Sequence, residues 1–110
     1  MEDDIAYRLL KSLEENPSQS QRELSRSLGI SLGKLNYCLK ALVEKGWVKA
    51  RNFKNNPNKA GYLYLLTPSG VEAKAKITLR FLQRKIVEYE QLRSEIEILQ
   101  REHQLIDQKY

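Results

Sequence analysis

The C-terminal part of this 110-residue chain constrains its fold more than any other feature, because it is predicted to be one unbroken helix. Thr67 and Pro68 supply an N-cap and a first-turn proline, and no proline follows them. A helix from Pro68 to near Tyr110 would be about 65 Å long at ~1.5 Å per residue. The remaining residues form too small a domain to cover that length. The sequence therefore predicts a globular domain over residues 1–67 and a protruding helix over residues 68–110.

Side chains in this helix recur with a heptad period, which is typical of a coiled coil. The two rows of the heptad are Leu82, Tyr89, Ile96, His103 and Tyr110, and, three residues further on, Lys85, Leu92, Leu99 and Ile106. We expect the helix to pair with a second copy through Leu82, Tyr89, Leu92, Ile96, Leu99 and Ile106. The pattern leaves open whether the two helices run parallel or antiparallel.

Three shorter helices are predicted ahead of this one. Ser20 and Ser31 are placed as N-caps, and Gly29 and Gly46 as the residues at which helices end. The predicted helices cover residues 5–15, 21–28 and 32–46. The second and third of these helices are joined by a tight glycine-containing turn, which is the spacing of a helix-turn-helix.

A β-hairpin is predicted to follow the third helix. The segments WVKARNF and GYLYLL favour strands, and KNNPNKA between them has the composition of a turn. Trp47 and Phe53 are expected to lie in the core at the base of the hairpin. In the second strand either Tyr62 and Tyr64 or Leu63 and Leu65 face the core, and the pattern does not decide which pair does. The predicted fold is mainly α with a small β-hairpin, a winged helix-turn-helix followed by a long C-terminal coiled-coil helix.

Basic residues are concentrated in the middle of the chain. Residues 17–60 carry nine basic and two acidic side chains, a net charge of +7. The segments 1–16 and 61–110 carry only −3 and +1. A localised excess of positive charge indicates a surface for a polyanion such as double-stranded DNA.

The third predicted helix has no acidic residue before Glu44, so its polar face can approach a DNA backbone without repulsion. Asn36 can pair with adenine, and Lys34 can reach guanine or phosphate. The candidate DNA contacts are Ser18, Ser20, Gln21, Arg22, Ser31, Gly33, Lys34, Asn36, Tyr37, Lys40, Arg51, Lys54, Asn55 and Lys59. The alternative interpretation is a solvated basic face, with Ser20 serving only as a cap and the lysines keeping an edge strand soluble.

Catalytic and metal-binding residues are scarce. Cys38 is the only cysteine, His103 the only histidine, and no glycine-rich phosphate loop occurs. We therefore expect no enzyme, no cofactor and no metal. An acidic N-terminus without a long apolar run predicts a cytoplasmic protein that does not enter a membrane.

The order of helix, helix-turn-helix, wing, LTPSG and long helix resembles the MarR-type winged-helix transcriptional regulators. The segment SQRELSRSLGISLGKLNYCLKALVEKGWVKARNFKNNPNK is more closely similar to small MarR-type regulators associated with bacterial exopolysaccharide gene clusters. The resemblance implies a DNA-binding homodimer that regulates transcription, with surface-polysaccharide genes as its implied target.

Two departures from the family pattern concern the wing and the ligand pocket. MarR proteins usually carry aspartate-x-arginine at the wing, and Asn55 and Pro57 stand at the aligned positions, so Lys54 or Lys59 would have to replace the arginine. Larger family members enclose a pocket for phenolic ligands between helices from both termini. This chain has a short N-terminal helix and one long C-terminal helix, so the resemblance does not imply that pocket or its ligand. The sequence identifies no small-molecule effector.

The sequence thus supports a sequence-specific transcriptional regulator that works as a homodimer. The alternative is a winged-helix interaction module whose tail recruits another protein, with only incidental DNA binding. A third hypothesis is a ligand- or redox-responsive switch that acts through Cys38 or the C-terminal helix, although no second cysteine can resolve an oxidised form of Cys38.

Overall fold

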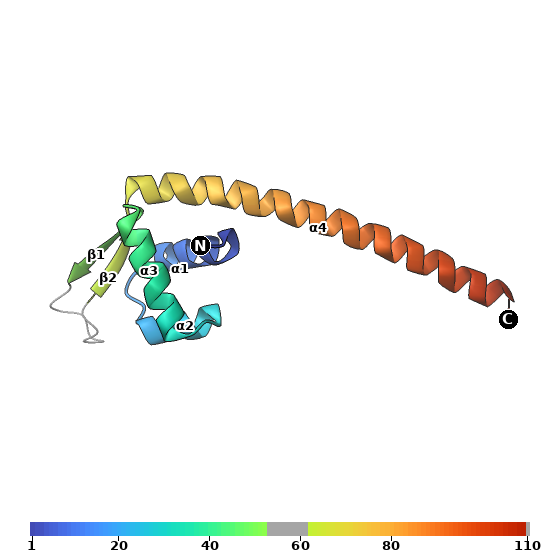
Figure 1. The fold of residues 1–110 in the computed structure, drawn as a ribbon, viewed down its shortest axis with the longest axis horizontal. Coiled ribbons are helices and arrows are strands. Elements are labelled where there is room, and N and C mark those ends of the chain that lie inside the picture. The colour runs from blue at the N-terminus through green and yellow to red at the C-terminus, as the bar shows by residue number, and fades with distance from the viewer. Residues whose placement is uncertain (53–61, 110) are drawn as a thin grey trace.

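Four helices and one antiparallel hairpin form the part of the chain that the structure describes, residues 1–52 and 62–109. In this computed structural model the elements are α1 (Asp3–Glu15), α2 (Gln21–Leu28), α3 (Leu32–Glu44), β1 (Val48–Asn52), β2 (Tyr62–Leu66) and α4 (Pro68–Lys109). The predicted winged helix with a long C-terminal helix is confirmed (Figure 1).

The turn of the helix-turn-helix is closed by local hydrogen bonds that its sequence specifies. The Ser20 hydroxyl accepts from the backbone N–H of Glu23 at 3.1 Å and begins α2. Gly29 adopts a left-handed conformation, with φ of 69°, at the end of the helix. The N–H of Ile30 then donates to the Ser25 carbonyl at 3.1 Å, so the chain reverses within the few residues that separate α2 from α3.

The same devices bound α3. Ser31 caps its start by accepting from the N–H of Lys34 at 3.1 Å. Gly46 has a φ of 75°, and the N–H of Trp47 donates to the Leu42 carbonyl at 3.1 Å. Both predicted glycine stops are therefore used as the sequence indicated.

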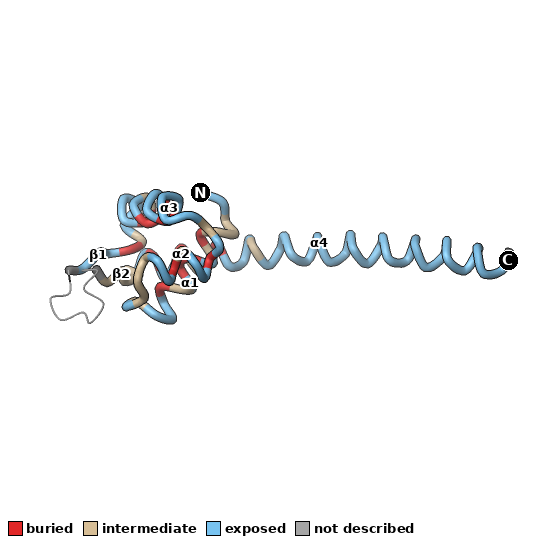
Figure 2. Tube along the Cα trace, turned by 90° about the horizontal axis from the view of Figure 1, so that it is seen from below, coloured by how far each residue is buried: buried red, intermediate tan, exposed pale blue. Residues whose placement is uncertain are grey.

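The core lies where α1, α2, α3 and β1 meet, and Figure 2 shows the buried residues confined to this end of the molecule. Cys38 is buried in it. The larger side chains that are fully buried are Leu9, Leu10, Leu24, Leu35, Leu42 and Ile77. The helix-turn-helix is thus held by leucines that recur at helical spacing.

The hairpin presents one face to this core. β1 and β2 pair antiparallel, with Val48 opposite Leu66 and Ala50 opposite Tyr64. Tyr64 and Leu66 pack against the core, as does Trp47 at the base of the hairpin. The sequence left open which face of β2 meets the core, and in the structure it is the face that carries Tyr64. The predicted core position of Phe53 and the wing-tip contacts Lys54, Asn55 and Lys59 lie outside the described residues.

The first turns of α4 pack against α1 and hold it to the domain. The rings of Tyr7 and Phe81 stack with centroids 4.9 Å apart. Arg80 pairs with Asp3 at 2.9 Å, and Lys74 pairs with Glu14 at 2.8 Å. Because the start of α1 meets the later of these α4 residues, the two helices run antiparallel.

Beyond these contacts α4 continues alone, as Figure 1 shows, and the molecule measures 72 × 26 × 21 Å. The residues of α4 from 82 to 108 are exposed, as Figure 2 shows. None of the described helices is both long and apolar enough to cross a bilayer.

Candidate nucleic-acid interface

Helix α3 divides its side chains between the core and the solvent. Leu35, Cys38, Leu39 and Leu42 are buried, and this anchors the helix in a fixed rotation. The exposed side chains include Lys34, Asn36, Tyr37 and Lys40, all of them predicted DNA contacts. The exposed face of α3 carries no acidic side chain until Glu44, in the last turn of the helix. A protruding helix with this face can enter a major groove.

Tyr37 protrudes into solvent from α3, with 73% of its surface exposed. An aromatic ring with so little protein around it is positioned to contact a sugar, a phosphate or a base edge. Gly33, one turn earlier, is surrounded by open space, so the backbone of α3 can approach another molecule closely there.

A groove of about 390 Å³ runs between α3 and the hairpin. It is lined by Asn36, Leu39, Lys40, Val43, Glu44, Ala50 and Tyr64. Two of the predicted DNA contacts, Asn36 and Lys40, line the groove on the side of α3. The small side chain of Ala50 lines it on the side of β1. Sequence reasoning missed Ala50 and Val43, although a small residue between the cations Lys49 and Arg51 was a usable signal.

The residues at the start of α2 have partners within the protein. Ser20 serves as the N-cap, and the Ser18 hydroxyl donates to the Asn16 side chain at 3.0 Å. The Gln21 amide donates to the Tyr64 hydroxyl at 3.1 Å, which ties α2 to the hairpin. Arg22 is exposed and remains a candidate phosphate contact.

On the hairpin, Arg51 is exposed on β1, two residues after the exposed Lys49. Side chains two apart on a strand share a face, so these two cations lie on the same side of the wing. Ala50, which lines the groove beside α3, lies between them on the strand, so the two cations point to the opposite face of β1.

A tight junction fixes the hairpin and α4 relative to α3. The N–H of Thr67 donates to the Trp47 carbonyl at 3.0 Å, and the Thr67 hydroxyl donates to the carbonyl of Gly46. The same hydroxyl accepts from the N–H of Gly70 at 3.0 Å and caps α4, as predicted. A Cβ on Gly70 would overlap the Trp47 carbonyl, so only glycine fits this approach. The LTPSG segment therefore locks α4 onto the end of the recognition unit.

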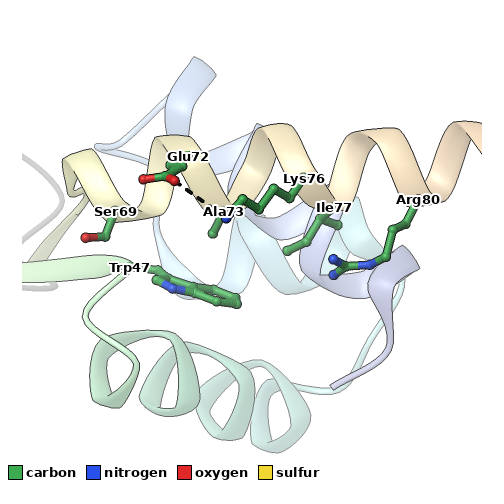
Figure 3. Close-up of a pocket in the computed structure, with 7 residues that line it drawn as sticks. All are labelled: Trp47, Ser69, Glu72, Ala73, Lys76, Ile77 and Arg80. Carbon is green, nitrogen blue, oxygen red and sulfur yellow. Dashed lines mark ion pairs between the residues drawn. The ribbon is translucent and has the colours of Figure 1, made fainter.

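Figure 3 shows the pocket beside this junction, about 250 Å³ between Trp47 and the first turns of α4. Its charged groups already have partners, because Lys76 pairs with Glu72 at 3.5 Å and Arg80 with Asp3 at 2.9 Å. The Arg80 guanidinium donates to the Asp3 carboxylate and lowers the pKa of that carboxyl. The pocket is thus part of the joint between the domain and its long helix.

The described residues contain no cluster of His, Cys, Asp and Glu that could hold a metal ion.

Residues 2–49 match the family described as winged helix-turn-helix DNA-binding. The match and the observed elements agree on a winged-helix fold for this part of the chain. No curated protein matches the sequence.

Several solved structures share the fold. A multiple antibiotic resistance repressor, MarR, is 29% identical with a TM-score of 0.60, over 72% of this chain and 56% of that chain. The PcaV regulator of Streptomyces coelicolor, solved with its natural ligand, is 18% identical with a TM-score of 0.65, over 74% of this chain and 57% of that one. The repressor CouR, bound to a 23-mer DNA duplex, is 24% identical with a TM-score of 0.56, over 66% of this chain and 49% of CouR.

This chain therefore shares its winged-helix fold with several MarR-type regulators. It spans a little over half the length of the first two structures.

Proposed function

We propose that this protein is a transcriptional regulator that reads a DNA sequence with α3 and works as a homodimer. The observation that carries the proposal is the exposed surface of α3, on which Lys34, Asn36, Tyr37 and Lys40 protrude. Asn36 and Lys40 also line the groove between α3 and the hairpin. CouR, a protein of the same fold, is bound to a DNA duplex in its structure.

Each residue of this face has a role that its chemistry suggests. The amide of Asn36 donates and accepts in the geometry that matches adenine in the major groove. Lys34 and Lys40 neutralise phosphate or reach guanine, and Tyr37 contacts the backbone or a base edge. Ser31 and Gly33 at the start of α3 allow a close approach.

The flanking elements add contacts that are independent of sequence. Ser18, Ser20 and Arg22 lie at the start of α2, where hydroxyls and N–H groups face phosphate in many complexes. Gln21 positions the hairpin through Tyr64. Arg51 extends the basic surface along β1, and Lys54, Asn55 and Lys59 are proposed to reach DNA from the wing tip.

Dimerisation has a physical reason in this scheme. One α3 offers few base contacts, whereas two linked copies read two half-sites and gain specificity that neither has alone. The exposed apolar residues of α4, among them Leu82, Leu92 and Leu99, are proposed to hold the two copies together. The surface-polysaccharide genes implied by the sequence resemblance are the proposed target.

A second candidate function is a protein-interaction module that recruits another protein through α4. The exposed apolar side chains of that helix favour it as well, because they suit any apolar partner helix. DNA affinity distinguishes the two candidates, since a recruiting module has no need of base discrimination.

The test is fluorescence anisotropy of the wild-type protein on a duplex selected from a random pool and on a scrambled duplex of equal length. A regulator binds the selected duplex at least 1,000-fold more tightly, and this ratio persists from low to physiological salt (order of magnitude). Equal binding to both duplexes that added salt abolishes would contradict the proposal and favour the interaction module.

A further inference from the structure

The exposed apolar stripe of α4 is longer than its heptads indicate. Val71 and Leu79 are each more than half exposed, although they lie over the part of α4 that packs on α1. The side chains that face the domain there are Ala73 and Ile77, which are buried. The stripe therefore starts in the first turns of α4, on the side turned away from the domain, and continues through Leu82 and beyond.

The stripe is also nearly symmetric about Tyr89. Toward the C-terminus it continues at Leu92, Ile96, Leu99 and His103, in steps of three, four, three and four residues. Toward the N-terminus it continues at Ile86, Leu82, Leu79 and Ala75, in the same steps. The two steps of three around Tyr89 interrupt the heptad, which explains why Ile86 belongs to the stripe while Lys85 pairs with Glu88 at 3.1 Å.

This symmetry fits two copies of α4 that run in opposite directions. When Tyr89 of each copy lies at the same level, Ile86 lies level with Leu92 of the other copy. Leu82 then lies level with Ile96, and Leu79 with Leu99. Each of these six apolar side chains is about half exposed in the single chain, so all of them gain a partner.

A hollow of about 260 Å³ marks the middle of the stripe. Tyr89, Leu92, Arg93 and Ile96 are among the residues that line it. Four side chains at this spacing form the kind of hole into which a side chain of a facing helix inserts.

Charge favours the antiparallel direction. The first half of α4, Pro68–Glu88, carries five basic and two acidic residues, and the second half, Tyr89–Lys109, carries three basic and five acidic residues. A parallel pair would set each half against its like, whereas an antiparallel pair sets opposite charges together.

Acidic residues of α1 neutralise part of the positive charge in the first half of α4. Lys74 pairs with Glu14, and Arg80 and Arg84 lie within 4 Å of Asp3, which reduces the excess of the first half. Lys85 pairs with its neighbour Glu88 on α4 and lies over the Phe81 ring, 5.3 Å from the ring centroid. In the antiparallel register Lys85 lies within about 3 Å, along the helix axis, of the level of Glu95 in the second copy.

We propose that a second copy of this chain covers the stripe of α4 in an antiparallel pair centred on Tyr89. This inference rests on the homodimer of the proposed function and adds its direction and register. The winged helices then lie at opposite ends of a rod, and each tail runs along the outer face of the other copy's first α4 turns.

Disulfide trapping distinguishes the two directions. We would introduce Tyr89→Cys, Leu82→Cys and Ile96→Cys singly in a Cys38→Ala background. The same variants would also be made with Cys38 retained, because that thiol is buried in the core. Cα atoms must come within about 7 Å for a disulfide. In the antiparallel pair Leu82 lies about 21 Å from its own symmetry mate along the axis, but level with Ile96.

The proposal predicts covalent dimers for Tyr89→Cys alone and for Leu82→Cys co-expressed with Ile96→Cys. It predicts few covalent dimers when Leu82→Cys or Ile96→Cys is expressed alone. Efficient trapping of Leu82→Cys by itself would show a parallel pair and overturn the proposal. Absence of trapping at Tyr89 together with a monomer mass by light scattering would also overturn it. DNA affinity of the wild-type protein is measured separately, so failure of this pairing and failure of DNA reading are distinguishable.

Discussion

Gly70 shows at the scale of one residue how the recognition unit and the long helix are joined. Its N–H donates to the Thr67 hydroxyl at 3.0 Å, and no side chain fits between it and the Trp47 carbonyl. The constraint is on space and not on conformation, because Gly29 and Gly46, and not Gly70, are the described glycines with positive φ. The junction therefore depends on the absence of a side chain at Gly70.

The substitution Gly70→Ala is expected to lower the free energy of unfolding by about 2 kcal/mol or more, because the methyl group meets backbone that cannot move aside. Urea unfolding followed by circular dichroism measures this change.

Gly33→Ala is the matched control, since open space surrounds Gly33 in α3. It should leave stability unchanged or raise it by about 0.5 kcal/mol through helix propensity. Equal stability of Gly70→Ala and the wild-type protein would contradict the close approach at the junction.

Local signals in the sequence were sufficient to predict the ends of α2 and the start of α3. Ser20 and Ser31 act as caps, and Gly29 ends α2 in the left-handed conformation, because these hydrogen bonds involve near neighbours. The prediction of the candidate interface likewise placed Lys34, Asn36, Tyr37 and Lys40 on one exposed face.

Contacts between distant residues were not predictable from these patterns. The bond from Gln21 to Tyr64 joins residues 43 apart, and it decides which face of β2 meets the core. Asp3 meets Arg80 across 77 residues, and α1 begins at Asp3 rather than at the predicted Ile5. The start of the α4 stripe was missed because Val71 and Leu79 fall outside the heptads, and only packing shows them exposed.

The ion pair of Asp3 and Arg80 links α1 to α4 and makes the joint between these elements sensitive to acid. The pKa of Asp3 lies below its ordinary value of 3.8, chiefly through the hydrogen bond from Arg80. A carboxyl with a lowered pKa stabilises the fold fully above about pH 4 and loses that contribution as the pH falls through its folded pKa.

Asp3→Asn is therefore expected to reduce stability at pH 6 by less than about 1 kcal/mol, since the pair is partly exposed. The difference from the wild-type protein should shrink below pH 4. Urea unfolding at pH 6 and pH 3 tests this, with Glu90→Gln as the control on the exposed part of α4. A difference that is constant over this range would show that the ion pair contributes nothing.

At the scale of the whole molecule, a small winged helix carries a helix that extends beyond it in a molecule 72 Å long. The domain supplies the surface proposed to read DNA, and the helix supplies the surface proposed to join two copies. Because the junction at Trp47 and Gly70 is tight, the direction of α4 fixes where the second α3 is placed.

The central claim is that α3 reads base sequence. The most direct test measures the affinities of two variants for the selected duplex and for duplexes that differ from it by one base pair. Asn36→Ala should lose discrimination at one base pair, worth about 1–3 kcal/mol. Lys40→Ala should weaken binding to every duplex alike and reduce the dependence on salt. If both variants weaken all duplexes equally, α3 contributes charge and not sequence recognition, and the account is contradicted.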